Sequence, residues 1–321
     1  MTQAHETIVI TSCTSRKKKV STVLALQGAD AVGSLTALAQ AWQRQVLAVG
    51  QGQLHAAGDL YGGRSITEAR HTANSLSAPL HIVSAGHGLL RAEDRIPSYD
   101  VTVTPASHNP LYRCLVRLGR SPADWWPALI EVFGVKRSLT RLVTDSPRSL
   151  VLLAVPSIYL NLLSRELDSL SDDALSRLRV LTSSYGASTL SARLQAAVMP
   201  YDERLEGLAD YAGTRSDFSQ RALRHFVAVL GGHALPLETA RQNVREAMRA
   251  LHKPILPARE RKTDDEIILL LGQNWNRLNG SSTALLRYLR DDALVSCEQS
   301  RFRSLHRHLL AELNEDSGTH G

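Results

Sequence analysis

The sequence contains few cysteines and no long apolar run. Its three cysteines, Cys13, Cys114 and Cys297, lie far apart and lack the spacing of a zinc site. An odd number of cysteines without a disulfide framework is typical of a reducing cytosol, so we expect a cytoplasmic protein. No stretch approaches the roughly 20 apolar residues of a membrane span, and a strand pattern begins at residue 7. We therefore expect a soluble, unprocessed chain without a membrane partner.

Motifs of several common catalytic sites are also missing. The chain has no G-x-x-x-x-G-K-S/T loop, no G-x-G-x-x-G, no H-E-x-x-H and no G-x-S-x-G. Nucleotide hydrolysis, redox chemistry and serine esterase chemistry are therefore poor candidates. His81, His87 and His108 lack the spacing of metal ligands. We expect neither a metal nor another cofactor.

The charge balance favours an anionic partner. The chain has 321 residues, 43% of them hydrophobic, which suffices for one large or two ordinary domains. Its formal net charge is +6 and its pI is near 9.4. An excess of cations favours nucleic acid as a partner, although metabolic enzymes can be equally basic.

Apolar runs separated by helical patterns predict a parallel sheet. The runs are rich in β-branched and aliphatic residues and lie at 7–12, 80–83, 150–157 and 179–184. Helical spacing of apolar residues occupies the intervals between them. Because strands that alternate with helices form a parallel sheet with helices on both faces, we predict an α/β catalytic-type domain over residues 1–200.

The pattern changes near position 200. No strong strand run follows, and amphipathic helical spacing continues toward the C-terminus. Helices predicted at 283–291 and 298–313 are joined by a short turn, which is typical of a helix-turn-helix unit. An ordinary helical hairpin with a basic face is the alternative. We predict a helical nucleic-acid-binding region over 201–321, in which Arg301 and Arg303 contact phosphates.

A basic loop follows the first predicted strand. Ser12 and Cys13 lead into four consecutive cations, Arg16, Lys17, Lys18 and Lys19. Hydroxyl groups, backbone N–H groups and cations in one loop can clamp a phosphate. We therefore predict that the four cations bind phosphates and that Ser12 and Cys13 contact substrate. The alternative is a solvated basic turn.

The stretch 80–104 contains the densest group of candidate site residues. Its strand ends in Ser84-Ala-Gly86-His87-Gly, where small residues allow backbone to approach a ligand closely. Ligands of open α/β sheets bind just beyond the carboxyl ends of the strands, where this turn is expected. The polar residues that follow include Glu93, Asp94, Tyr99 and Asp100. We predict substrate contacts by Ser84, Gly86, His87 and Tyr99.

A second glycine turn lies at 61–64. Tyr61 beside Gly62 is placed to offer its ring to a ligand, or alternatively only fills the loop. Arg64 is a further predicted phosphate ligand. Ser65 and Glu68 have the spacing of a capping box, which predicts that a helix starts there.

These groups suit cleavage of an N-glycosidic bond in nucleic acid. That reaction needs a groove for phosphates, a pocket for a flipped-out base and a carboxylate near the sugar. The transition state resembles an oxocarbenium ion, so a carboxylate stabilises it by charge or directs a water molecule. Asp100 is the first candidate for this carboxylate, and Glu93 and Asp94 are the second. Tyr61 or Tyr99 would stack on the base or donate to it.

The order and spacing of four motifs resemble a bacterial family of largely uncharacterised domains. The motifs are Ser12-Cys13 followed by lysines, Leu60-Tyr61-Gly-Gly-Arg, Ile82-Val-Ser84-Ala-Gly-His87-Gly-Leu-Leu90, and Ile96-Pro-Ser-Tyr99-Asp100. These domains are related to the peroxide-stress protein that binds DNA; the chain departs from the family at His87, where Tyr is usual. The wider group is similar to uracil-DNA-glycosylase-like folds and to domains found with tRNA-guanine transglycosylases, and several members accompany phage-defence or DNA-modification systems. The resemblance implies nucleobase chemistry on DNA or RNA.

Three hypotheses follow from the residues and the resemblance together. The leading one is a DNA glycosylase, a hydrolase that removes a modified nucleobase from double-stranded DNA in antiviral defence. The second is a non-catalytic DNA-binding protein of the stress-response or defence type. The third is a transferase that exchanges a base in RNA.

Overall fold

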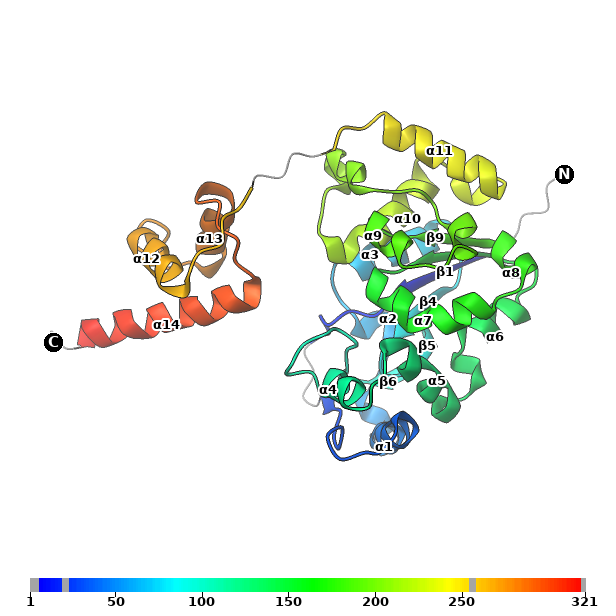
Figure 1. Cartoon of the computed structure of the whole chain (residues 1–321), viewed down its shortest axis with the longest axis horizontal. Helices are drawn as coiled ribbons and strands as arrows, with labels where there is room; N and C mark the ends of the chain where they lie inside the picture. Colours follow the sequence, from blue (N-terminus) through cyan, green and yellow to red (C-terminus); the bar gives the residue numbers. More distant parts are fainter. Residues whose placement is uncertain (1–5, 19–22, 254–257, 319–321) are drawn as a thin grey trace. The chain divides into compact units, whose positions relative to one another are not determined.

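The chain forms two compact units, residues 1–254 and 255–321. The structure is a computed structural model that describes residues 6–18, 23–253 and 258–318 (Figure 1). We predicted a boundary after residue 200, whereas the first unit continues to 254. The reason is the helical segment that follows residue 200, which packs on the sheet of the first unit.

The first unit is built on a mostly parallel sheet, which confirms the predicted α/β class, but its fifth, antiparallel strand was not predicted. Its strands, in the order β5-β4-β1-β8-β9, are β5 (Gly88–Arg91), β4 (Leu80–Ser84), β1 (Thr7–Ser12), β8 (Leu150–Ala154) and β9 (Leu178–Leu181). Four strands are parallel, with Val9 opposite Leu80 and Thr11 opposite Ala154, and β5 alone runs antiparallel. The carboxyl ends of β1, β4 and β8 therefore meet at one edge of the sheet.

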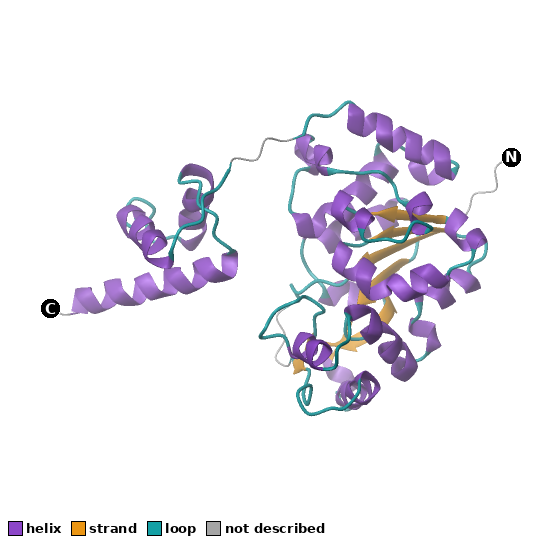
Figure 2. Cartoon of the chain, viewed as in Figure 1, coloured by secondary structure: helices purple, strands orange, loops and turns teal. Residues whose placement is uncertain are grey.

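Helices cover both faces of this sheet, and Figure 2 shows the strands as a layer between them. Alternation along β1 sends Ile8 and Ile10 into one apolar core and Val9 into the other. The first core packs against α1 (Leu35–Leu47), α4 (Pro110–Arg117), α5 (Pro122–Phe133), α6 (Leu139–Asp145), α7 (Ser157–Ser169) and α8 (Asp172–Ser176). The second packs against α3 (Arg64–Ser75), α10 (Phe218–Ala228) and α11 (Leu237–Arg249).

Short elements complete the first unit. Two small sheets pair β2 (Leu24–Ala25) with β7 (Tyr99–Asp100), and β3 (Leu54–Ala56) with β6 (Arg95–Pro97). The short helices are α2 (Ala57–Leu60), α9 (Ser184–Ser188), η1 (Gln51–Gln53), η2 (Val135–Arg137), η3 (Leu194–Ala197), η4 (Glu203–Gly207), η5 (Ala209–Tyr211), η6 (Arg215–Asp217) and η7 (Gly232–Ala234).

Helix α3 does not begin with the predicted capping box. Its N-cap is Gly63 at φ 101°, and no side chain caps it. The Glu68 carboxylate instead forms ion pairs with Arg64 and, from α10, with Arg224, both at 3.1 Å. Glu68 therefore joins two helices, a use that the sequence spacing does not reveal.

Buried polar groups of α10 explain why residues beyond 200 belong to the first unit. The Gln220 amide donates to Thr11 Oγ1 and to the Ala154 carbonyl, both at 2.9 Å. The Arg221 guanidinium is fully buried and pairs with Asp217 at 2.8 Å and with Glu206 at 3.2 Å. These bonds fix α10 and the segment before it to the ends of β1 and β8.

The second unit is a small helical unit with its own apolar core. It contains α12 (Asp264–Asn274), α13 (Ser282–Arg287), the π-helical turn η8 (Tyr288–Asp292) and α14 (Gln299–Gly318). A short connection joins η8 to α14, which gives the predicted pair of helices. Ile267, Leu285 and Phe302 lie in the core. Thr263 and Glu266 form a capping box at the start of α12.

The two units differ in charge. Residues 255–321 contain nine lysines and arginines against ten aspartates and glutamates, so the second unit is close to neutral. The positive excess of the chain therefore lies in residues 1–254. Among the described residues, no helix is both long and apolar enough to cross a membrane.

We predict that Arg221→Ala destabilises the first unit by about 3–5 kcal/mol, because it leaves the buried Asp217 carboxylate without its partner. The control is Arg245→Ala on α11, which removes an ion pair to exposed Glu238 and should cost less than about 1 kcal/mol. Urea unfolding of both variants measures the difference. Equal losses would contradict the proposed role of the buried pair.

Candidate functional site

The predicted site lies at the carboxyl ends of β1 and β4. The Cys13 N–H donates to the Val83 carbonyl at 2.9 Å, which holds the start of the basic loop beside the end of β4. The loop is also tied to the glycine turn, because the Gly62 N–H donates to the Arg16 carbonyl at 2.9 Å and Lys17 forms an isolated bridge with Tyr61. Two segments that the sequence analysis singled out therefore meet here.

Three buried hydroxyl groups form the centre of this site. The Tyr99 hydroxyl lies 2.6 Å from the Tyr61 hydroxyl and 2.7 Å from Ser84 Oγ. Both rings and the serine are buried. Burial raises the pKa of Tyr61 and of Tyr99 well above 10, so both phenols stay protonated and can donate. The substrate contacts predicted for Tyr61, Ser84 and Tyr99 thus fall on buried side chains that bond to one another.

Lys17 brings a positive charge to this cluster. Its Nζ lies 4.4 Å from the centroid of the Tyr99 ring and 5.8 Å from that of Tyr61. Burial lowers the pKa of Lys17, and the neighbouring Cys13 and Asp100 oppose that shift. An amine in this setting can exchange a proton more readily than an exposed lysine.

Asp100 lies at the exposed side of the cluster. It follows Tyr99 in β7, so the Tyr99 side chain is buried and that of Asp100 is open to solvent. Its charge acts on Lys17. Within the described ranges no hydrogen bond or ion pair holds its carboxylate. Asp100 can therefore approach a bound molecule without giving up another contact.

Tyr159 belongs to the same site and was not predicted. Its hydroxyl lies 3.0 Å from the Cys13 thiol, and burial raises its pKa well above 10. It stands on the first turn of α7, directly after β8. The sequence could have predicted this, because residues that follow a central strand lie at the same edge of the sheet as Cys13 and Ser84.

His87 and Gly86 pack against the ring of Tyr99. The His87 ring lies 4.8 Å from that of Tyr99, and its pKa falls to about 3 because of burial, Arg137 and Lys17. It is therefore neutral at pH 7 and positions Tyr99 by packing. The Trp42 indole donates to the Gly86 carbonyl at 2.6 Å and the Trp125 indole to Ala85 at 2.8 Å, so the turn is fixed by two side chains that the sequence analysis did not assign to it.

Glu93 and Asp94 do not join this site. Because β5 is antiparallel and pairs Arg91 with His81, the turn after β5 lies at the amino end of β4, opposite Ser84. Asp94 accepts from the Arg91 N–H at 3.0 Å and forms an ion pair with Arg137. Glu93 is exposed at the same turn. Asp100 is thus the one member of the predicted carboxylate set at the carboxyl edge.

The predicted phosphate ligands are divided among several places. Arg16 and Lys18 are exposed in the basic loop, and Lys19 lies outside the described residues. Arg64 is engaged by Glu68 and by the Ala212 carbonyl, at 3.1 and 2.5 Å. Its predicted phosphate role does not fit this arrangement. The remaining two predicted phosphate ligands, Arg301 and Arg303, lie on α14.

The two arginines of α14 differ in their contacts. Arg301 pairs with Asp264 at 2.7 Å and donates to the Lys262 carbonyl at 2.8 Å, so it joins α14 to the start of α12. Arg303 is exposed.

Ser12, predicted as a substrate contact, is buried at the end of β1. In the part of the chain that the structure describes, no group of three or more His, Cys, Asp or Glu side chains is placed to hold a metal.

We predict that Gly86→Ala lowers the stability of the first unit by about 1–3 kcal/mol, because its Cβ would lie 2.8 Å from Tyr99 Cε2. Gly33→Ala is the control, since a Cβ there meets nothing within 4 Å. Urea unfolding compares the two. If both variants were as stable as the wild type, the Tyr99 ring would not be held as described.

We also predict a loss of stability at high pH. The pKa of Tyr61, Tyr99 and Tyr159 is higher in the folded chain than the ordinary value near 10, so their contribution is complete below pH 10 and is lost as the pH rises above it. Absorbance at 295 nm should show these three phenols ionising only together with unfolding. Ionisation of all tyrosines near pH 10 in folded protein would contradict this.

Similarity to known proteins does not identify the chain. Comparison with protein-family models, curated proteins and solved structures gives no significant match.

Proposed function

We propose that the chain is a DNA glycosylase-like enzyme that hydrolyses the N-glycosidic bond of a modified nucleobase. The observation that carries the proposal is the position of the Lys17 amine, over the Tyr99 ring and within the field of the exposed Asp100 carboxylate. An anion and a cation placed together at the carboxyl edge of the sheet suit a reaction in which a sugar becomes positive and a base leaves as an anion.

Each group has a role in that reaction. The Asp100 carboxylate stabilises the oxocarbenium-like sugar or directs a water molecule to C1′. The water adds its hydroxyl to C1′ as the C1′–N bond breaks and gives its proton to the Asp100 carboxylate, while the Lys17 ammonium protonates the departing base. Tyr61 and Tyr99 hold Lys17 in place, and Arg16 and Lys18 offer exposed cations for phosphates.

A second candidate is a DNA-binding protein without catalysis. The exposed side chains of Arg16 and Lys18 and the positive excess within residues 1–254 favour it. Because the second unit is nearly neutral, α14 contributes little to the electrostatic attraction between the chain and DNA. In this case Asp100 would be dispensable for the protein's action on DNA.

The first test is release of a base. Purified protein incubated with DNA carrying unmodified, methylated, hydroxymethylated or glucosylated bases should release one of them, detected by mass spectrometry, and RNA of the same sequence distinguishes a base-exchanging transferase. Asp100→Ala should lower the rate by at least about 100-fold, in the range typical of catalytic acid–base and charge-stabilising groups. Glu93→Gln, at the opposite edge, is the matched control. Absence of release from every substrate would remove the proposal.

The second test separates binding from catalysis. Arg16→Ala and Lys18→Ala together should reduce the slope of log affinity against log salt by about 2, one for each lost phosphate contact. Asp100→Ala should leave that slope unchanged. Fluorescence anisotropy of labelled duplex at several salt concentrations measures both. A slope unaffected by the double variant would place the DNA contacts elsewhere.

A further inference from the structure

The backbone on both sides of Lys17 is tied to the glycine turn. The Lys18 N–H donates to the Leu60 carbonyl at 2.9 Å. The Gly62 N–H donates to the Arg16 carbonyl, also at 2.9 Å. The Lys17 side chain therefore starts from a backbone position that the protein fixes by itself, which is what a group that reacts with a substrate requires.

The Lys17 amine is partly open to solvent and forms no ion pair among the residues that the structure describes. Its Nζ lies 4.4 Å from the centroid of the Tyr99 ring. Because burial lowers the pKa of this amine, it gives up its proton more readily than an exposed lysine does. An amine without its proton is a nucleophile that forms Schiff bases with carbonyl groups.

The proposed glycosylase reaction would leave such an amine next to a carbonyl group. Lys17 becomes a neutral amine when its ammonium protonates the departing base. The sugar that stays in the DNA has lost its base, and its ring opens to an aldehyde at C1′. The nucleophile and the aldehyde therefore arise together, at positions that the reaction has already brought close.

The surroundings of Lys17 suit the cation that a Schiff base forms. A protonated Schiff base carries its positive charge at Nζ, where the face of the Tyr99 ring stabilises a cation. The Asp100 carboxylate lies at the exposed side of the same cluster, and its charge acts on Lys17. Since no hydrogen bond or ion pair holds this carboxylate within the described ranges, it is available to accept a proton.

The neighbours of Lys17 favour an aldehyde that is part of a nucleic acid. Arg16 and Lys18, on either side of it in sequence, are exposed and form no ion pair in the part of the chain that the structure describes. An abasic sugar in DNA has a phosphate on each side, whereas a free sugar has none. Two cations beside the amine therefore attract the first more strongly than the second.

We infer that Lys17 is the nucleophile of a second activity, an abasic-site lyase that cleaves the DNA strand after the base has left. Nζ bonds to C1′, and the aldehyde oxygen leaves as water with one proton from the amine and one from solvent. Asp100 then takes a proton from C2′ as the C3′–O bond breaks and the phosphate departs. Water hydrolyses the Schiff base and frees the amine. The inference rests on the proposed function, because base removal supplies the abasic site.

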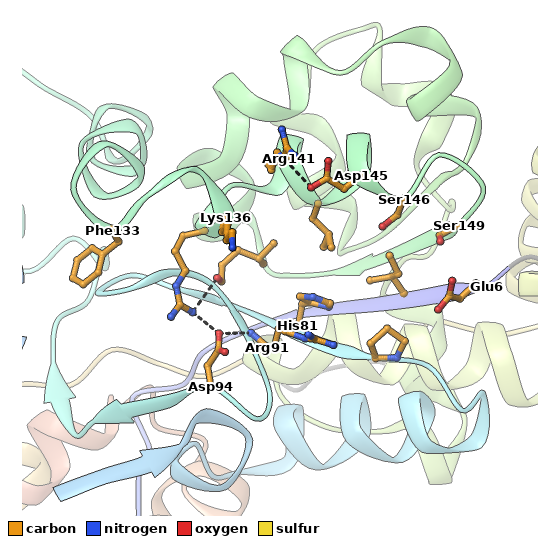
Figure 3. A pocket seen from close by; sticks show the side chains of 15 residues that line it. Glu6, His81, Arg91, Asp94, Phe133, Lys136, Arg141, Asp145, Ser146 and Ser149 are labelled. Carbon is orange, nitrogen blue, oxygen red and sulfur yellow. Dashed lines mark hydrogen bonds and ion pairs between the residues drawn. The ribbon is translucent and has the colours of Figure 1, made fainter. Parts of the chain in front are cut away.

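A lysine at the other edge of the sheet serves as the control. A cavity of about 650 Å³ lies at the amino ends of the strands. Residues directly before β1, β4 and β8 line it (Figure 3), namely Glu6, Pro79 and Ser149. Lys136 also lines this cavity, is exposed and forms no ion pair among the described residues. It matches Lys17 in charge and in lacking an ion pair, but it lies far from the Tyr99 ring.

The test uses the full-length protein and duplex DNA with one preformed abasic site, so that no base has to be removed. The protein should cleave the strand at that site. Sodium borohydride, which reduces a Schiff base to a stable amine, should trap a protein–DNA complex, and mass spectrometry of its peptides should place the DNA on Lys17.

Variants separate the nucleophile from its charge. Lys17→Arg keeps the positive charge but forms no Schiff base, so cleavage and trapping should each fall at least about 100-fold. Lys136→Arg should change neither. Circular dichroism confirms that each variant is folded, and the peptide that carries the trapped DNA identifies the nucleophile in the unchanged protein.

Three results would each overturn the inference: no DNA trapped on Lys17, cleavage by Lys17→Arg at the rate of the unchanged protein, or free deoxyribose trapped on Lys17 as readily as the abasic duplex at equal concentration. Because the abasic site is supplied, a protein that fails this test can still release a base, and one that releases no base can still pass it.

Discussion

The hydrogen bonds among the Tyr61, Tyr99 and Ser84 hydroxyls are the constraint on which the candidate site depends. They join three separate segments: the turn after α2, the end of β4 and the short strand β7. Each hydroxyl is buried and needs a partner, so the three segments have one favourable arrangement. That arrangement fixes the Tyr99 ring, and the ring in turn provides the surface over which the Lys17 amine lies. Gly86 also contributes to this arrangement, because its lack of a side chain leaves room for the Tyr99 ring.

The two edges of the sheet have different chemistry, although both are basic. The carboxyl edge presents a thiol, phenols and one amine in a mostly buried cluster, with a single exposed carboxylate at its margin. The amino edge is an open cavity in which two cations, Arg137 and Arg141, are already neutralised by carboxylates. The carboxyl edge therefore suits a reaction at one bond.

Most of the fold could be predicted from sequence because it depends on local pattern. The apolar runs at β1, β4, β8 and β9 and the helical spacing between them are visible without coordinates, and so is the position of Ser84 at the carboxyl end of its strand. The errors arise where distant groups decide the outcome. Glu93 and Asp94 follow Ser84 closely in sequence, but the antiparallel strand β5 carries them to the other edge. The sequence predicts that Arg64 binds phosphate and that Glu68 caps a helix. In the structure Glu68 forms ion pairs with Arg64 and with Arg224 of α10. The boundary at 200 failed for the same reason, because only the structure shows Gln220 reaching Thr11 and Ala154.

The separate apolar core of residues 255–321 has a thermodynamic consequence. The buried residues of that core all lie within residues 255–321, and those of the two cores that enclose the sheet all lie within residues 1–254. Heating should therefore melt the chain in two steps, and the calorimetric enthalpy should exceed the van't Hoff enthalpy calculated for a single transition. The free energy of unfolding is then a property of each unit, and a substitution in α10 shifts only the transition of the unit that contains the sheet.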